Sequence, residues 1–124
     1  MVHTSPLTGL RMLVVEDEAM IAMLVEDLLT DLGCIVVDVA GTLEQGMALA
    51  DPAASQLDGA ILDINLGGEK VFPIADLLAA RGVRFLFATG YGAQGVEPRY
   101  GDRPVLAKPF RRDALERALV AELT

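Results

Sequence analysis

The sequence contains little cysteine and little histidine. Its single cysteine, Cys34, excludes an internal disulfide and fits a reducing cytosol. Its single histidine, His3, has no second ligand at a useful spacing, so the sequence predicts no zinc or copper site of histidine and cysteine. Any metal site in this chain is therefore expected to use oxygen ligands.

Positive charge is also scarce. The chain has 10 lysine and arginine residues against 18 aspartate and glutamate residues, which gives a net charge of −8. Binding to the phosphate backbone of a nucleic acid normally needs a basic surface, so we expect no nucleic-acid partner. An acidic chain of this kind suits metal cations or other proteins as binding partners.

Long apolar runs and targeting segments are missing as well. No apolar run approaches the roughly 20 residues that a transmembrane helix requires, so we expect no membrane insertion. Residues 1–9, MVHTSPLTG, lack the charged start and the apolar middle of a signal peptide, and we interpret them as the polar leader of a cytoplasmic protein. Residues 10–124 are expected to form one domain, because a hydrophobic content of 52% is enough for a core.

Short apolar runs alternate with helical patterns along this domain. Apolar runs predict five strands, and apolar residues at helical spacing predict four helices. The strands are expected at 10–15, 35–39, 60–62, 83–88 and 105–107, and the helices at 19–32, from Thr42 onward, at 71–80 and at 113–123. Segment 91–104 is rich in glycine and proline, so where a further helix would fall we expect a loop or at most one turn.

This alternation predicts an α/β fold, in which helices cover both faces of a doubly wound, five-stranded parallel sheet. In such sheets ligands bind at the carboxyl ends of the strands. The residues that end the predicted strands are therefore the candidates for function.

Complementary polar groups stand at these strand ends. The acidic triplet Glu16–Glu18 follows the first strand, Asp63 the third, Thr89 the fourth and Lys108 the fifth. Carboxylates crowded at one edge repel each other unless a cation or a proton intervenes. Oxygen ligands favour a hard cation such as Mg²⁺, and a lysine and a hydroxyl beside it would suit a phosphoryl group.

Each group alone has an ordinary structural explanation. Acidic residues after a strand often cap a helix, a threonine can cap a turn, and a lysine is common at a surface. The functional interpretation depends on four strand ends that supply matching groups.

Four motifs, in order, resemble the receiver domain of bacterial two-component response regulators. They are VVEDE at 14–18, LDINL at 62–66, ATG at 88–90 and KPF at 108–110. The resemblance extends over nearly the whole of residues 10–124. It implies a flavodoxin-like sheet with strand order 2-1-3-4-5. It also implies a function: the domain accepts a phosphoryl group from a phosphohistidine, on a sensor histidine kinase or a histidine phosphotransfer protein, and then switches protein interactions or relays the phosphate.

The resemblance also implies a role for each matching residue. Asp63 matches the phosphoacceptor, and Asp17 matches a carboxylate that binds Mg²⁺ directly. Glu16 matches the neighbour that holds the metal through water, although aspartate is commoner there. Asn65 matches the residue whose backbone carbonyl completes the metal site. Together these residues form the expected magnesium site.

Thr89 matches the hydroxyl that bonds the phosphoryl group, and Lys108 matches the family's lysine. The family usually relays the change through an aromatic residue three positions before that lysine, where this chain has Val105. The stretch FATGYG partly resembles a receiver subgroup with a Phe-Ala-Thr-Gly-x-Tyr signature, whose tyrosine comes one position later than Tyr91. Two hypotheses stay open: Tyr91 orders with its loop on phosphorylation as a switch, or it only covers the site.

Two methionines of the first predicted helix are candidates for a docking surface. Met20 and Met23 lie on the face of the first helix away from its apolar stripe, where they either dock the phosphohistidine protein or fill gaps at the helix edge. The downstream protein is unknown, and a monomer or weak dimer is expected. The family implies no enzymatic activity beyond magnesium-dependent self-phosphorylation and slow autodephosphorylation. The alternatives are a phosphate sink for a kinase and a metal-dependent phosphatase, although the latter's Asp-x-Asp is absent after the first strand.

Overall fold

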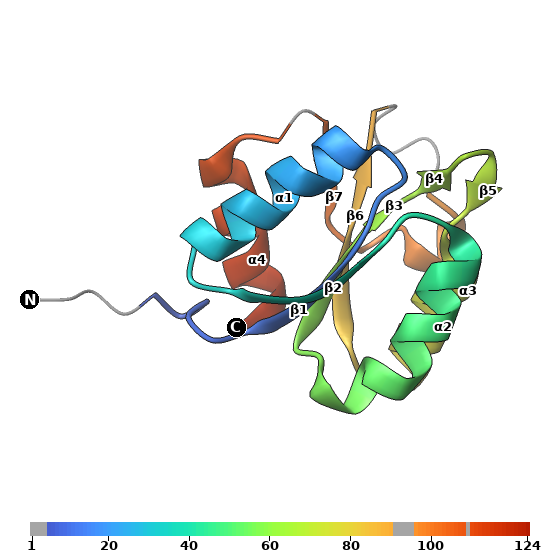
Figure 1. Cartoon of the computed structure of the whole chain (residues 1–124), viewed down its shortest axis with the longest axis horizontal. Helices are drawn as coiled ribbons and strands as arrows, with labels where there is room; N and C mark the ends of the chain where they lie inside the picture. Colours follow the sequence, from blue (N-terminus) through green and yellow to red (C-terminus); the bar gives the residue numbers. More distant parts are fainter. Residues whose placement is uncertain (1–4, 91–95, 109) are drawn as a thin grey trace, which may run out of the picture.

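The central element is a sheet of five parallel strands (Figure 1). A computed structural model of the chain describes residues 5–90, 96–108 and 110–124. The strands of the sheet are β1 (Arg11–Val15), β2 (Ile35–Ala40), β3 (Gly59–Asp63), β6 (Arg84–Thr89) and β7 (Val105–Ala107). They are arranged in the order β2-β1-β3-β6-β7, which confirms the expected order 2-1-3-4-5.

In the described part of the chain, four α-helices cover this sheet, two on each face. Helices α1 (Ala19–Asp31) and α4 (Arg112–Leu123) cover one face, and α2 (Leu43–Ala53) and α3 (Phe72–Ala80) cover the other (Figure 1). A short 3-10 turn, η1 (Ala54–Gln56), follows α2. The flavodoxin-like α/β class is thus confirmed, with element bounds within one or two residues of those expected.

The sequence accounts for the helix ends. At the start of α2, the Thr42 hydroxyl accepts a hydrogen bond from the Gln45 backbone N–H at 3.0 Å, and the Gln45 side chain accepts one from the Gly41 N–H at 2.9 Å. The first of these bonds satisfies a backbone donor that the helix start leaves unpaired, and the second ties the residue before the cap to the first turn. At the end of α1, Gly33 has a φ of 96°, a left-handed conformation that suits glycine and stops the helix.

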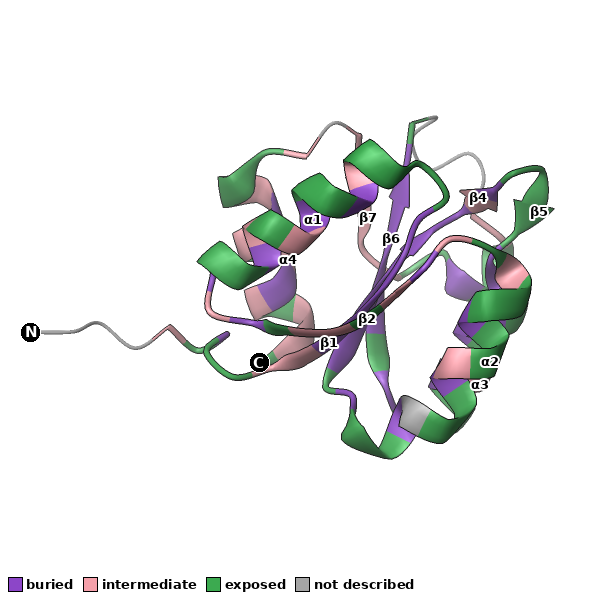
Figure 2. Cartoon of the chain, viewed as in Figure 1, coloured by how far each residue is buried: buried purple, intermediate pink, exposed green. Residues whose placement is uncertain are grey.

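The core has two parts, one on each face of the sheet, and the central strands β1, β3 and β6 are almost wholly buried between them (Figure 2). All five residues of β3 are buried, which is why the central strands read as continuous apolar runs rather than as alternating ones. Leu7, within the expected leader, has no exposed surface and packs with Val25, Leu29 and Leu119. Within the described residues, no helix is both apolar and long enough to span a bilayer.

The segment between β6 and β7 contains no full helix in its described part. Residues Pro98–Tyr100 form a single 3-10 turn, η3, as the glycine and proline content predicts. Tyr100, which the sequence pattern did not single out, is only 7% exposed. Its ring packs against Phe72 of α3 and against Phe85 and Phe87 of β6, with ring centroids 5.5 to 6.1 Å apart. The Tyr100 side chain therefore helps to cover the sheet in the segment where no full helix was expected.

Polar contacts hold this turn against α3. The Tyr100 hydroxyl donates to Asp76 Oδ1 at 2.5 Å, and the Arg99 guanidinium donates to both carboxylate oxygens of Asp76 at 3.0 Å. Burial is the main cause that raises the pKa of the Tyr100 hydroxyl, and the Asp76 carboxylate adds to it. The hydroxyl therefore remains a donor to Asp76.

A second, two-stranded sheet was not predicted. It is a hairpin of β4 (Asn65–Leu66) and β5 (Glu69–Lys70), directly after Asp63. Its two turn residues, Gly67 and Gly68, have φ values of 59° and 95°, which a tight hairpin turn of this kind requires and glycine supplies without strain.

Candidate functional site

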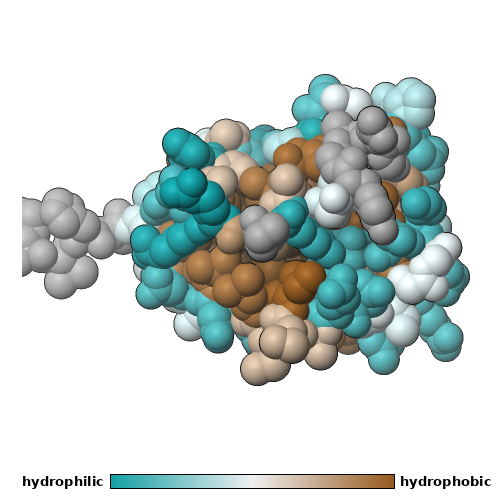
Figure 3. Space-filling view, turned by 90° about the horizontal axis from the view of Figure 1, so that it is seen from above, coloured by the Kyte–Doolittle hydropathy of each residue, from teal (hydrophilic) through white to brown (hydrophobic). Residues whose placement is uncertain are grey.

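A polar pocket lies where the strands of the main sheet end. Figure 3 views the molecule from this side. The pocket has a volume of about 150 Å³, and its lining comes from the ends of β1, β3 and β6, from the hairpin and from the residue after β7. The lining residues are Asp17, Glu18, Asp63, Asn65, Thr89, Gly90 and Lys108. Parallel strands end at the same edge of the sheet, so groups far apart in the sequence meet there.

Lys108 joins two carboxylates beside this pocket. Its Nζ lies 3.0 Å from Asp63 Oδ2 and 2.6 Å from Glu16 Oε1, and both acidic residues are 4% exposed. Burial alone would lower the pKa of the Lys108 ammonium, but its pairing with Glu16 and Asp63 raises that pKa above its ordinary value. Lys108 therefore stays charged and offers a fixed positive charge next to Asp63.

The environment of Asp63 disfavours its ionised form. Burial is the largest cause that raises the pKa of this carboxyl group to about 7, and the neighbouring Glu16 adds to it, while Lys108 opposes the shift. The surroundings of Asp63 therefore favour its protonated form more than those of an exposed aspartate do. A divalent cation in the pocket would offset the repulsion between the carboxylates of Asp63 and Glu16.

Asp17 differs from Asp63 in environment and in pKa. Burial raises the pKa of the Asp17 carboxyl, but hydrogen bonds that involve Asp63, Glu16 and the Gly67 backbone lower it overall. Asp17 Oδ2 accepts a hydrogen bond from the Gly67 N–H at 3.0 Å. Asp17 is therefore ionised at neutral pH and available as a ligand for a cation.

The hairpin directs the backbone of Asn65 away from its partner strand. The Val71 N–H donates to the Ile64 carbonyl at 2.9 Å. Because bonded and non-bonded pairs alternate in an antiparallel ladder, the next pair, Asn65 and Lys70, is non-bonded. The Asn65 N–H donates instead to Asp63 Oδ1 at 3.3 Å. The Asn65 carbonyl likewise lies outside the ladder, on a residue that lines the pocket, which fits its expected role as a ligand.

The available donor atoms fit a hard cation. Carboxylate oxygens of Glu16, Asp17 and Glu18 lie within 4.8 Å of one another, and no histidine or cysteine lines the pocket among the described residues. Oxygen ligands of this kind suit Mg²⁺. Glu18 lines the pocket but was not among the predicted ligands, although it belongs to the acidic triplet that drew attention to this strand end.

Glu16 lies differently from the other expected ligands. Its Oε1 pairs with Lys108, and its Oε2 accepts a hydrogen bond from the Glu18 N–H at 3.1 Å. It is absent from the pocket lining, whereas Asp17, Asp63 and Asn65 belong to it. Three of the four expected metal ligands therefore line the pocket, and Glu16 lies next to them, with its carboxylate near those of Asp17 and Glu18 and paired with Lys108.

Thr89 is the last residue of β6, is 3% exposed and lines the pocket beside Gly90. Its backbone carbonyl accepts a hydrogen bond from the Lys108 N–H at 2.9 Å, so the backbones of the expected hydroxyl residue and the expected lysine are linked directly. Tyr91, the other expected switch residue, lies outside the described residues.

The chain is similar to several solved structures. No family model and no curated protein sequence matches the chain. Among solved structures, SdrG from Sphingomonas melonis Fr1 is 46% identical with a TM-score of 0.78, and the match covers 91% of this chain and 95% of SdrG. The BeF3-activated conformation of SdrG from Pseudomonas melonis Fr1 is 47% identical with a TM-score of 0.74, over 90% of this chain and 93% of that one. The response regulator REC domain of PhyR from Erythrobacter litoralis is 27% identical with a TM-score of 0.73, over 94% of this chain and 95% of that one.

Proposed function

Because this chain belongs to the response regulator receiver domains of two-component signalling, we propose that Asp63 is the residue that accepts the phosphoryl group. The observation that carries this assignment is the position of Asp63. It ends β3 at the wall of the pocket, with the Lys108 ammonium 3.0 Å away and acidic candidate ligands around it. A buried carboxylate beside a cation site and a lysine is suited to attack a phosphoryl group.

The proposed reaction is a single displacement at phosphorus. An oxygen of Asp63 forms a bond to the phosphorus of a phosphohistidine, the P–N bond breaks, and its electron pair stays on the imidazole nitrogen of the partner protein. Both the carboxylate and the phosphoryl group are anionic, so their approach needs compensating charge. Lys108 supplies one positive charge in contact with Asp63.

Three pocket residues, Asp17, Asp63 and Asn65, would hold Mg²⁺, with the carboxylates of Glu16 and Glu18 close to that of Asp17. When bound, the cation supplies the positive charge that neutralises the phosphoryl oxygens. That SdrG, at 47% identity, has a BeF3-activated conformation supports activation of this chain by a phosphoryl-like group. Thr89, at the end of β6, is proposed to bond a phosphoryl oxygen and to move with it.

Chelation of the divalent metal is expected to abolish phosphorylation. Without the cation, the carboxylates of the pocket repel the incoming phosphoryl group, and Lys108 is the one positive charge that compensates among the described lining residues. The measurement is the intact mass of the protein after incubation with acetyl phosphate, with Mg²⁺ and with EDTA. EDTA saturated with Mg²⁺ beforehand serves as the control. Undiminished phosphorylation in free EDTA would contradict the proposed metal site.

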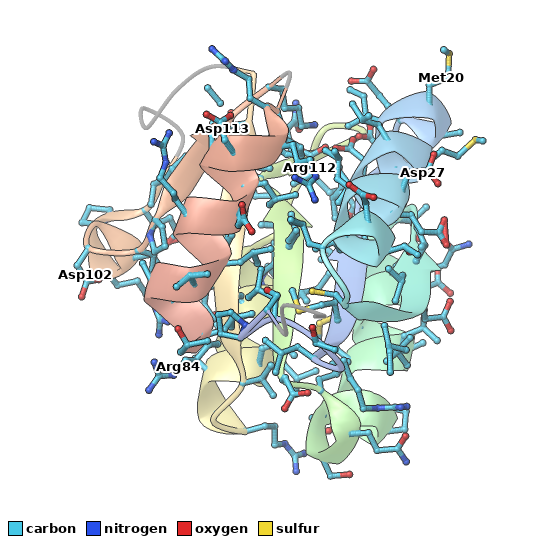
Figure 4. The ribbon with its side chains drawn as sticks, turned by 90° about the vertical axis from the view of Figure 1, so that its left-hand side faces the viewer. Met20, Asp27, Arg84, Asp102, Arg112 and Asp113 are labelled. Carbon is cyan, nitrogen blue, oxygen red and sulfur yellow. The ribbon has the colours of Figure 1, made fainter. Side chains whose placement is uncertain are left out.

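The partner that supplies the phosphohistidine is proposed to dock on α1. Met20, Met23 and Leu24 are 84%, 63% and 41% exposed, and Met20 points away from the rest of the molecule (Figure 4). Apolar side chains gather on the half of the end face over which α1 runs (Figure 3). Because α1 begins directly after Glu18, a protein bound to this helix also reaches the pocket.

Negative charge on this face of α1 is expected to slow phosphoryl transfer from the protein partner but not from a small phosphodonor. Replacing both Met20 and Met23 with glutamate removes apolar contact and adds charge, so transfer from the cognate kinase or phosphotransfer protein should fall by about 10-fold or more. Phosphorylation by acetyl phosphate should be unchanged. A phosphotransfer profile against the host's kinases identifies the partner for this assay. The matched control is Met47→Glu, a half-exposed methionine on α2 across the sheet. Equal rates for the double variant and the control would refute this docking face.

A further inference from the structure

The hairpin after Asp63 is closed by a side chain. Asn65 Oδ1 accepts a hydrogen bond from the Gly68 N–H at 3.2 Å. This bond spans the turn from the first residue of β4 to its second glycine, and it adds to the single ladder of two short strands. A hairpin of this size has little stability of its own, so a side-chain bond across the turn has a large share in fixing its shape.

The backbone of the same turn also contacts Asp17, which lies just after the end of β1. With Gly67 in its left-handed conformation, its N–H points to Asp17 Oδ2 at 3.0 Å, although the two residues are 50 positions apart in the sequence. Asp17 is exposed, and an exposed aspartate samples several rotamers. A backbone donor held by the turn favours the Asp17 rotamer that keeps this bond, in addition to the contacts of this carboxyl group with Asp63 and Glu16.

We propose that the Asn65 side chain is a positioning residue for the cation site, a role separate from that of its backbone carbonyl. By closing the turn, it aims the Gly67 N–H at Asp17 and so fixes the direction of the Asp17 carboxylate. This proposal rests on the proposed function, because it takes the pocket to bind Mg²⁺. Groups that orient a metal ligand from behind typically change metal affinity by 10- to 100-fold when they are removed.

The test is the affinity of the full chain for Mg²⁺, measured by titration calorimetry, together with the melting temperature in Mg²⁺ and in EDTA. Asn65→Ala is expected to weaken Mg²⁺ binding by about 10-fold and to reduce the increase in melting temperature that Mg²⁺ produces. Asn65→Ser, which keeps an oxygen acceptor for the Gly68 N–H, should bind Mg²⁺ more tightly than Asn65→Ala. The matched control is Lys70→Ala, an exposed residue of the same hairpin, which should bind Mg²⁺ as the wild type does.

The outcomes separate this role from the proposed function. If the wild type binds Mg²⁺ and Asn65→Ala binds it equally well, the positioning role is overturned and the metal site stands. An equal loss of melting temperature with and without Mg²⁺, at unchanged affinity, would show a purely structural role for Asn65 and would also overturn the proposal. If the wild type itself binds no Mg²⁺ at millimolar concentration, the proposed metal site fails, and the role of Asn65 fails with it.

Discussion

Asp63→Asn is expected to leave a folded protein that takes up no phosphoryl group. The amide of asparagine has nearly the shape of the carboxylate but is a poor nucleophile, so the O–P bond cannot form. The fold should persist, because the substituted carboxyl group is one whose ionised form its surroundings already disfavour. Lys108 also keeps its contact with Glu16 at 2.6 Å.

The measurement for Asp63→Asn is intact mass after incubation with acetyl phosphate and Mg²⁺, with circular dichroism to check the fold. Asp102→Asn is the matched control, since Asp102 is an exposed aspartate on a different side of the molecule from α1 (Figure 4). The control should gain one phosphoryl group as the wild type does. A full mass gain in Asp63→Asn would sink the assignment of the phosphoacceptor.

Tyr100→Ala is expected to destabilise the protein by about 3–5 kcal/mol, the usual cost of removing a large buried aromatic side chain. The ring contacts three phenylalanines of α3 and β6, and its loss opens a cavity over the sheet. For a domain of this size, a loss of that order should lower the melting temperature by roughly 10 °C or more. Thermal and urea unfolding measure both quantities.

Tyr100→Phe is the matched variant, because it keeps the ring and removes only the hydroxyl. Its cost should be about 1 kcal/mol, since Asp76 remains paired with Arg99 after the hydroxyl is gone. If Tyr100→Ala unfolds with nearly the same free energy as the wild type, the turn at Pro98–Tyr100 does not seal the core.

The parallel strands and the pocket at their ends were predictable from the sequence for a physical reason, whereas the strand order followed from the family resemblance. Apolar runs of three to six residues mark the buried strands, and Asp63 and Thr89 prove to be the last residues of β3 and β6. Since parallel strands end at one edge, the identity of these terminal residues was enough to predict a shared pocket. The structure brings Asp17, Asp63, Asn65, Thr89 and Lys108 together there, as expected.

The hairpin and the role of Glu16 were not predictable in this way. Strands of two residues, such as Asn65–Leu66, are too short to show any alternation of apolar and polar side chains. Whether Glu16 reaches the pocket or the lysine depends on the path of its side chain. Only the packed structure shows its Oε1 paired with Lys108.

The sequence by itself determined the class of this protein, because apolar periodicity, the residues at the strand ends and the four motifs can each be recognised within a short stretch of sequence. Tertiary structure alone decided the contacts between distant segments. The Tyr100 ring closes the core against Phe72, Phe85 and Phe87, and its hydroxyl bonds Asp76, 24 positions away. The Gly67 N–H bonds Asp17 from 50 positions away. Such contacts form only when the chain folds and brings distant segments together. The composition of one segment does not identify the segment that it will contact.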